Sequence, residues 1–263
     1  MPTLRRQALS VLLECKPDDK VAKALAADPD LPTGAATTID TPPGIPGRPE
    51  RPVLVAPGDV PRRGLGTVEG RAALIHALAH IELNAVDLAA DACWRFPDLP
   101  DDFYRDWSGV MRDEASHFAM LTGHLATLGY RYGDFPAHAA LWEMAERTRD
   151  DVLARMALVP RTLEARGLDA SPAVRHKLQS AGDRSGAAIV DVLLRDEVRH
   201  VRIGNRWYGW LCERRGLDPL ATYAALAAVY RAPTPRGPFN VDARRAAGFT
   251  AAELDALAGP DPA

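Results

Sequence analysis

Two copies of one short motif contain the residues of this sequence that are best suited to bind a metal ion. The stretches Arg112-Asp-Glu-Ala-Ser-His117 and Arg195-Asp-Glu-Val-Arg-His200 share the pattern R-D-E-x-x-H. A spacing of three residues puts Glu and His on the same side of a helix, one turn apart, so both side chains can reach one ion. Carboxylate oxygens and imidazole nitrogens together suit iron or manganese. Zinc is a poorer match because its usual sites have four ligands.

Each motif follows a single glutamate on the preceding helical stretch. Glu82 precedes Glu114 by 32 residues, and Glu164 precedes Glu197 by 33. Helical spacing puts these glutamates among apolar side chains, where a lone carboxylate is costly unless it is paired, protonated or bound to a cation. Two bound divalent ions would supply that counter-charge. The predicted ligands are Glu82, Glu114, His117, Glu164, Glu197 and His200.

Glu164 is the predicted ligand that has alternatives. Pro160 is expected to kink the helical segment one turn before Glu164. Glu143 and Glu146 lie on the same segment and could replace Glu164, although apolar and polar side chains are more mixed on their faces.

Four long helical segments must position these ligands. They are rich in Ala, Leu and Arg and contain few β-branched runs, which favours helix. Gly129, Gly167 and Gly216 follow three of the segments and are typical helix C-caps. The similar lengths, about 28 to 33 residues, predict an all-α protein built on a four-helix bundle. The expected segments are residues 68–95, 101–128, 137–166 and 183–215.

The 22 prolines fall mainly outside the predicted bundle and divide the chain into three parts. Thr250 and Glu253 make a capping box for a short helix in the last part. Ser171-Pro172 and Asp218-Pro219 are typical of the first residues of shorter helices. The three expected parts are an N-terminal helix with a Pro/Gly-rich strap (1–66), the helical bundle (67–231) and a Pro-rich tail with a short helix (232–263).

Composition and charge exclude several classes of protein. Hydrophobic residues make up 47% of the chain and charged residues 25%, which are ordinary values for a globular protein. A net charge of -3 gives no sign of a general nucleic-acid binder. Three cysteines, far apart in the chain, form neither a disulfide framework nor a CxxC metal site, which favours a cytoplasmic location. No apolar run approaches the roughly 20 residues that span a bilayer, so no membrane span is expected.

Over residues 67–215 the ligand pattern resembles the ferritin-like superfamily of di-iron and di-manganese proteins, which implies that the four-helix bundle is ferritin-like. The stretch Asp196-Glu-Val-Arg-His200 is similar to the D-E-x-R-H signature of its oxygenases and oxidases, whereas Ser116 stands where the first motif would have Arg. The resemblance implies that Asp113 and Asp196 hydrogen-bond ligand histidines, and that Arg199, the arginine of the signature, lies beside the ligands.

Three further phrases resemble a bacterial family known as domain of unknown function 455. They are His76-Ala-Leu-Ala-His-Ile-Glu82, Phe135-Pro-Ala-His138 and Pro235-Arg-Gly-Pro-Phe-Asn240. This resemblance covers nearly the whole chain. It implies a fold and no particular activity.

A polar stripe on the first long segment is turned away from Glu82. It is either a solvated or helix-contacting face, or a network on the substrate side of the site. Its members are His76, His80, Asn84, Asp87 and Asp91.

Three residues are candidate accessories to the metal site, namely His80, His124 and Tyr208. His124 lies one heptad after His117 and is either a core histidine or a neighbour of the ligands. Tyr208 lies two turns past His200. A basic stripe opposite Glu197 is either a solvated and paired face or a contact for an anion or RNA; its members are Arg195, Arg199, Arg202 and Arg206.

Two functional hypotheses follow. In the first, the protein holds two iron ions, or manganese, and uses O2 or peroxide to oxidise an unidentified small or RNA-borne substrate, with an electron donor that the sequence does not identify. In the second, it handles metal without an organic substrate, by ferroxidase activity or peroxide removal. A structural bundle with a vestigial metal is a third reading. The long flanking segments could cover a substrate pocket or stabilise a homodimer.

Overall fold

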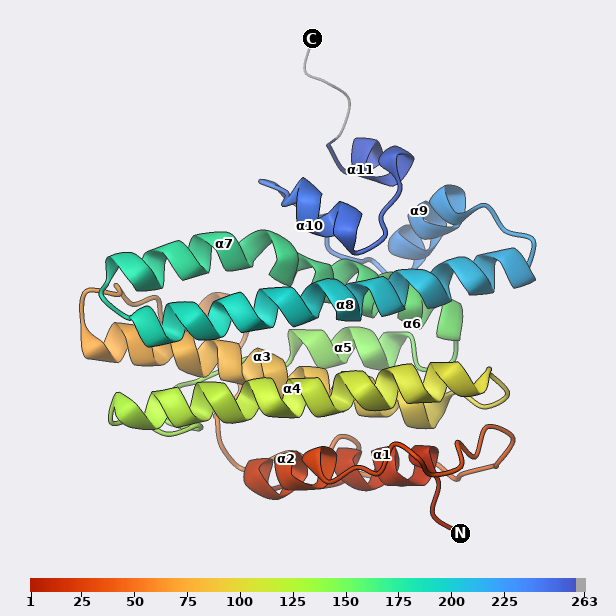
Figure 1. Cartoon of the computed structure of the whole chain (residues 1–263), viewed down its shortest axis with the longest axis horizontal. Coiled ribbons are helices and arrows are strands. Elements are labelled where there is room, and N and C mark those ends of the chain that lie inside the picture. Colours follow the sequence, from red (N-terminus) through yellow and green to blue (C-terminus); the bar gives the residue numbers. More distant parts are fainter. Residues whose placement is uncertain (259–263) are drawn as a thin grey trace. The chain divides into compact units, whose positions relative to one another are not determined.

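A computed structural model describes residues 1–258 of the chain, and within them every regular element is a helix (Figure 1). The described backbone contains one isolated β-bridge, between Leu54 and Ala137, and no strand. The predicted all-α class is therefore confirmed. The chain divides into two compact units, of which unit 1 contains residues 1–142 and 177–189, and unit 2 contains residues 143–176 and 190–263.

The helices are distributed over both units. Unit 1 contains α1 (Leu4–Leu12), α2 (Pro17–Leu25), the short 3-10 helix η1 (Pro57–Asp59), α3 (Val68–Arg95) and α4 (Asp101–Thr127). Unit 2 contains α6 (Val152–Leu158), the π-helix η2 (Val159–Glu164), α9 (Pro219–Val229), α10 (Val241–Ala246) and α11 (Ala251–Ala258). Three helices contribute residues to both units, namely α5 (Ala140–Arg147), α7 (Ala165–Ser180) and α8 (Arg184–Arg214).

In unit 1 the antiparallel helices α3 and α4 pack along their lengths (Figure 1). By length and composition α3 could cross a membrane, with a mean hydropathy of 1.2 over its most apolar window, but 72% of that window is buried inside the protein. Burial of this kind is what the core helix of a soluble protein shows. Side chains such as His76, Glu82 and Asp91 are also buried on α3, and a lipid-exposed span would not carry them.

The N-terminal helices are part of the unit 1 core. Leu4, Val11 and Leu12 of α1 are almost completely buried. Arg5 is 2% exposed, and its Nε donates a 2.9 Å hydrogen bond to the carbonyl of Trp94 at the end of α3. The segment before α3 thus contributes both apolar contacts and a buried polar contact to α3.

Most predicted helical segments are confirmed, and one is wrong. The first segment matches α3, and the second and fourth match α4 and α8 to within one residue at each end. The third, predicted to run over residues 137–166, is instead α5, a turn, α6 and η2, and the helical backbone then continues through α7. Gly129 and Gly216 have the expected left-handed φ of +83° and +65°, whereas Gly167 lies inside α7 and caps no helix.

Pro172 lies inside α7 and does not begin a new helix there. A proline in this position cannot donate to the carbonyl four residues earlier, that of Leu168. The Nδ2 of Asn240 donates to this carbonyl at 3.2 Å. The C-terminal segment thus supplies the donor that Pro172 lacks, which explains why the helix can pass through the proline.

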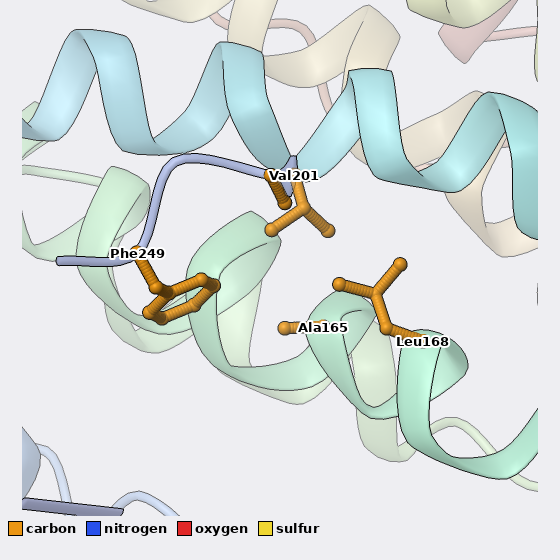
Figure 2. Close-up of a cluster of buried hydrophobic side chains, with 5 residues drawn as sticks. Ala165, Leu168, Val201 and Phe249 are labelled. Carbon is orange, nitrogen blue, oxygen red and sulfur yellow. The ribbon is translucent and has the colours of Figure 1, made fainter. Parts of the chain in front are cut away.

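The core of unit 2 joins α7, α8 and the C-terminal segment. Figure 2 shows Val201 of α8 beside Ala165 and Leu168 of α7, with Phe249 packed nearby. Around this cluster, Arg244 donates two hydrogen bonds to the carboxylate of Asp169, at 3.0 and 2.6 Å. The predicted capping box is confirmed: Thr250 and Glu253 exchange hydrogen bonds of 2.8 and 3.3 Å. The predicted start of a helix at Asp218-Pro219 is also confirmed, as α9.

The π-helix η2 lies directly against a glycine of α8. A Cβ added at Gly204 would lie 2.6 Å from Cβ and 2.7 Å from Cγ of Pro160. Both are ring carbons that cannot rotate away. The predicted kink at Pro160 is therefore realised as one π-helical stretch whose proline ring fills the space over Gly204.

Gly204→Ala is expected to destabilise the protein by about 1–3 kcal/mol, because the new methyl group forces η2 away from α8. Gly209→Ala on the same helix is the matched control, since a Cβ there meets nothing within 4 Å, and its expected effect is a gain of up to about 1 kcal/mol. Chemical denaturation of both variants measures the difference. Equal effects at the two positions would contradict the close packing.

Candidate metal centre

Three predicted ligands come together in unit 1. Glu82 lies on α3, and Glu114 and His117 lie one turn apart on α4. The Nδ1 of His117 is 3.1 Å from Oε2 of Glu82 and 3.0 Å from Oε2 of Glu114. One ligand atom from each residue lies within 4.8 Å of the other two, which is close enough for all three to bind one ion.

This cluster is buried and strongly acidic. Glu82, Glu114 and His117 are 8%, 1% and 2% exposed. Burial, followed by repulsion from Glu114, raises the pKa of Glu82 well above its usual value. Burial opposes protonation of His117, but its hydrogen bonds with Glu114 and Glu82 prevail and raise its pKa to about 10. Both shifts have the same meaning: the two carboxylates need a positive charge between them, and without a metal ion a proton supplies it.

In unit 2 the second motif has the same local geometry on α8. The Nδ1 of His200 is 3.4 Å from Oε2 of Glu197, and the His200 side chain is fully buried while that of Glu197 is 17% exposed. The two side chains thus share one side of α8, as the spacing of three residues predicts.

Glu164 is the last residue of η2 and is half-buried. Gly167 follows three residues later on α7, so the two share a side of the helix. A Cβ at Gly167 would lie 3.5 Å from Cγ of Glu197. The side of the helix that bears Glu164 therefore faces α8 close to Glu197. This is an ordinary contact distance, so Gly167 is neither the predicted helix end nor a position that only glycine could occupy.

The two alternatives to Glu164 are not buried. Glu143 and Glu146 are exposed on α5, and Glu143 makes only a long 3.9 Å ion pair with Arg147.

The residues expected beside the ligands are partly or fully exposed. Asp113 is half-buried on α4 and Arg199 is exposed on α8. The carboxylate of Asp196 accepts two 2.9 Å hydrogen bonds from Arg195. The basic stripe as a whole is exposed; within it Arg202 donates to the carbonyl of Ala246.

Two candidate accessory residues have structural partners. His124 lies 2.9 Å from Oδ2 of Asp183, and the other oxygen of Asp183 accepts from the backbone N–H of Gly186 at 2.8 Å, which caps α8. Tyr208 donates to the carbonyl of Pro219 at 2.6 Å. Both are thereby hydrogen-bonded within the packed helices of their own units.

The polar stripe of α3, which includes the third candidate accessory residue, His80, is entirely buried. His80 contacts the hydroxyl of Tyr132 through Nδ1 at 2.7 Å and the carbonyl of His138 through Nε2 at 3.0 Å. Tyr132 also stacks on His76, with ring centroids 5.1 Å apart. The sequence gives the stripe itself but not Tyr132, because this partner lies on a loop without a regular pattern.

The described residues thus form a helical protein with a buried carboxylate–histidine cluster. Residues 13–255 match the family described as "Protein of unknown function (DUF455)", and the chain belongs to this family. An uncharacterised protein of Haemophilus influenzae is 51% identical over 214 residues, which are 79% of this chain and 74% of that protein. No solved structure matches the chain. The resemblance to domain of unknown function 455 is therefore confirmed.

Proposed function

We propose that this protein is a ferritin-like dinuclear metal protein with oxidoreductase activity. The observation that supports the proposal most directly is the buried cluster of Glu82, Glu114 and His117. Two carboxylates within reach of one imidazole, all nearly inaccessible to water, are costly to bury without a cation. Their oxygen and nitrogen donors suit iron or manganese.

The second ion is assigned to Glu164, Glu197 and His200 from the repeated sequence pattern. Each ligand set then has one single glutamate and one Glu-x-x-His pair, which is the composition of the ferritin-like di-metal site. The proposal that the two sets share one dinuclear centre rests on the sequence pattern.

The protein's own residues have defined tasks in this proposal. Glu82 and Glu114 would hold an ion and neutralise its charge, and His117 would bind it as a neutral imidazole, without the proton that it holds in the metal-free cluster. The apolar side chains that bury the cluster exclude bulk water. When bound, iron or manganese would supply redox chemistry with O2 or peroxide.

Metal analysis and electron paramagnetic resonance test the metal site. The full-length protein reconstituted with Mn²⁺ is expected to bind about two ions per chain, and their spectrum is expected to be that of an exchange-coupled pair. Two uncoupled signals would contradict a shared centre, and binding of no metal after reconstitution would overturn the proposal.

Reaction with O2 tests the activity. Anaerobic loading with Fe²⁺ followed by O2 is expected to give a transient optical species that decays faster in the presence of substrate. Sustained conversion of Fe²⁺ to a mineral would instead favour the second hypothesis, metal handling without an organic substrate.

A further inference from the structure

A second polar site lies in unit 1, between the N-terminal segment and α3. It is a cavity of about 30 Å³. Its polar lining consists of Lys20 from α2, Arg48 from the strap, Tyr132, and His80, Asn84 and Asp87 from α3. Leu54 also lines the cavity and is 42% exposed, so the lining reaches the protein surface at this residue.

The charges of this cavity do not balance. Lys20, 1% exposed, forms an ion pair with Asp87 and donates to the carbonyl of Gly47 at 3.0 Å. Arg48 carries a further positive charge into the lining and makes no hydrogen bond or ion pair with any other residue of the described range 1–258. The nearby carboxylate of Asp91 is already bound by Arg95. The lining therefore has one uncompensated positive charge.

The neutral side chains of the lining already make hydrogen bonds within the protein. The Nε2–H of His80 donates to the carbonyl of His138, and Nδ1 then accepts from the hydroxyl of Tyr132. Burial lowers the pKa of His80 to about 4, which agrees with this neutral form. Asn84 donates to the backbone carbonyl of His80 at 2.7 Å. The donors that remain for a ligand are the guanidinium of Arg48, the third N–H of Lys20 and the second N–H of Asn84.

The size of the cavity limits the ligand. A water molecule needs about 10–15 Å³ of such space, so 30 Å³ holds two oxygen-sized groups. A carboxylate has two oxygens in one plane, which the fork of a guanidinium binds in parallel. A phosphate has four oxygens and a larger charge. We propose that this cavity binds the carboxylate group of a small organic acid between Arg48 and Lys20, with the rest of the molecule directed toward Leu54.

Binding of ¹³C-labelled acetate to the full-length protein at pH 8 tests the proposal. At this pH Asp87, whose pKa burial raises to about 6, is ionised and paired with Lys20. Wild type is expected to shift the acetate signal saturably, and Arg48→Gln is expected to weaken the binding at least tenfold. Arg51→Gln is the matched control, since it removes the same charge from an exposed position of the same strap, and should bind as wild type does.

The comparison of these two variants is independent of the metal site. Acetate bound to a metal ion or elsewhere on the surface contributes equally to both, so the difference between them reports the cavity alone. Arg48→Lys, which keeps the charge but lacks the fork, is expected to bind with intermediate affinity. Equal acetate binding by Arg48→Gln and Arg51→Gln would overturn the proposal. So would tighter binding of inorganic phosphate than of acetate at the same ionic strength.

Discussion

Glu82→Gln is expected to destabilise the metal-loaded protein but not the metal-free protein. In the metal-free protein, glutamine keeps the shape of the side chain and removes a carboxylate that is buried beside Glu114. The free energy of unfolding is expected to stay the same or to rise by about 1 kcal/mol. In the loaded protein the same change removes a ligand and is expected to weaken metal binding more than about 100-fold. At saturating metal this is a loss of about 2.7 kcal/mol of stabilisation.

The pH dependence of the metal-free protein gives this prediction a second test. The pKa of Glu82 is raised in the folded state. At a pH between the unfolded and the folded pKa, Glu82 therefore keeps its proton in the folded state and has lost it in the unfolded state. The contribution of Glu82 to stability is complete below the unfolded pKa of 4.5 and is lost as the pH rises. The gain from Glu82→Gln is therefore expected to be larger at pH 8 than at pH 5.

Thermal and chemical denaturation with a chelator or with saturating Mn²⁺ measures both effects. Glu143→Gln is the control, because Glu143 is exposed on α5 and should change neither state. An equal loss of stability with and without metal would contradict the metal site, and would show that Glu82 acts only as a hydrogen-bond acceptor for His117.

The local parts of the candidate site could be predicted from the sequence, and the contacts between distant segments could not. The side of the helix shared by Glu114 and His117 follows from helical geometry alone, as does that shared by Glu197 and His200. The end predicted at Gly167 is wrong because a glycine after a helical pattern is only a weak stop signal. The helix α7 continues through this residue.

The polar stripe of α3 also shows that contacts between distant segments could not be predicted from the sequence. Its spacing on one side of a helix is evident from the sequence. The sequence alone permits a solvated or helix-contacting face, or a network on the substrate side of the site. The structure excludes solvation, since His76 and Asp91 are 1% and 0% exposed. The groups that cover this stripe include Lys20 and Tyr132, which lie about 60 and 50 residues away in the chain, and no periodic pattern relates them to α3.

Arg161→Ala is expected to cost about 3–5 kcal/mol, the largest loss of stability predicted for a single substitution in unit 2. Arg161 lies in η2 and is 6% exposed. Its guanidinium donates to Oδ1 of Asn205 at 2.9 Å and to the carboxylate of Glu253 at 2.5 Å. Alanine would leave Glu253, which is 8% exposed, as a buried carboxylate without its cation.

Aromatic rings add to this loss. The guanidinium carbon of Arg161 lies 4.8 Å from the ring centre of Tyr208, 5.3 Å from that of Tyr223 and 4.9 Å from that of Phe249. Cations at such distances are attracted to the face of a ring, and the rings also lose packing contacts when the side chain is removed. Arg161 thus connects η2, α8, α9 and the C-terminal segment.

A double-mutant cycle separates these contributions. Arg161→Ala with Glu253→Gln is expected to cost less than the sum of the single changes, because the neutral glutamine no longer needs a cation. Arg245→Ala is the control: Arg245 and its partner Asp242 have side chains that are 65% and 96% exposed, and the expected loss stays below about 1 kcal/mol. A loss of that small size for Arg161→Ala as well would contradict the burial of the pair. Since Arg161 and Glu164 both lie on η2, Arg161→Ala is also expected to weaken metal binding, whereas Arg245→Ala should leave it unchanged.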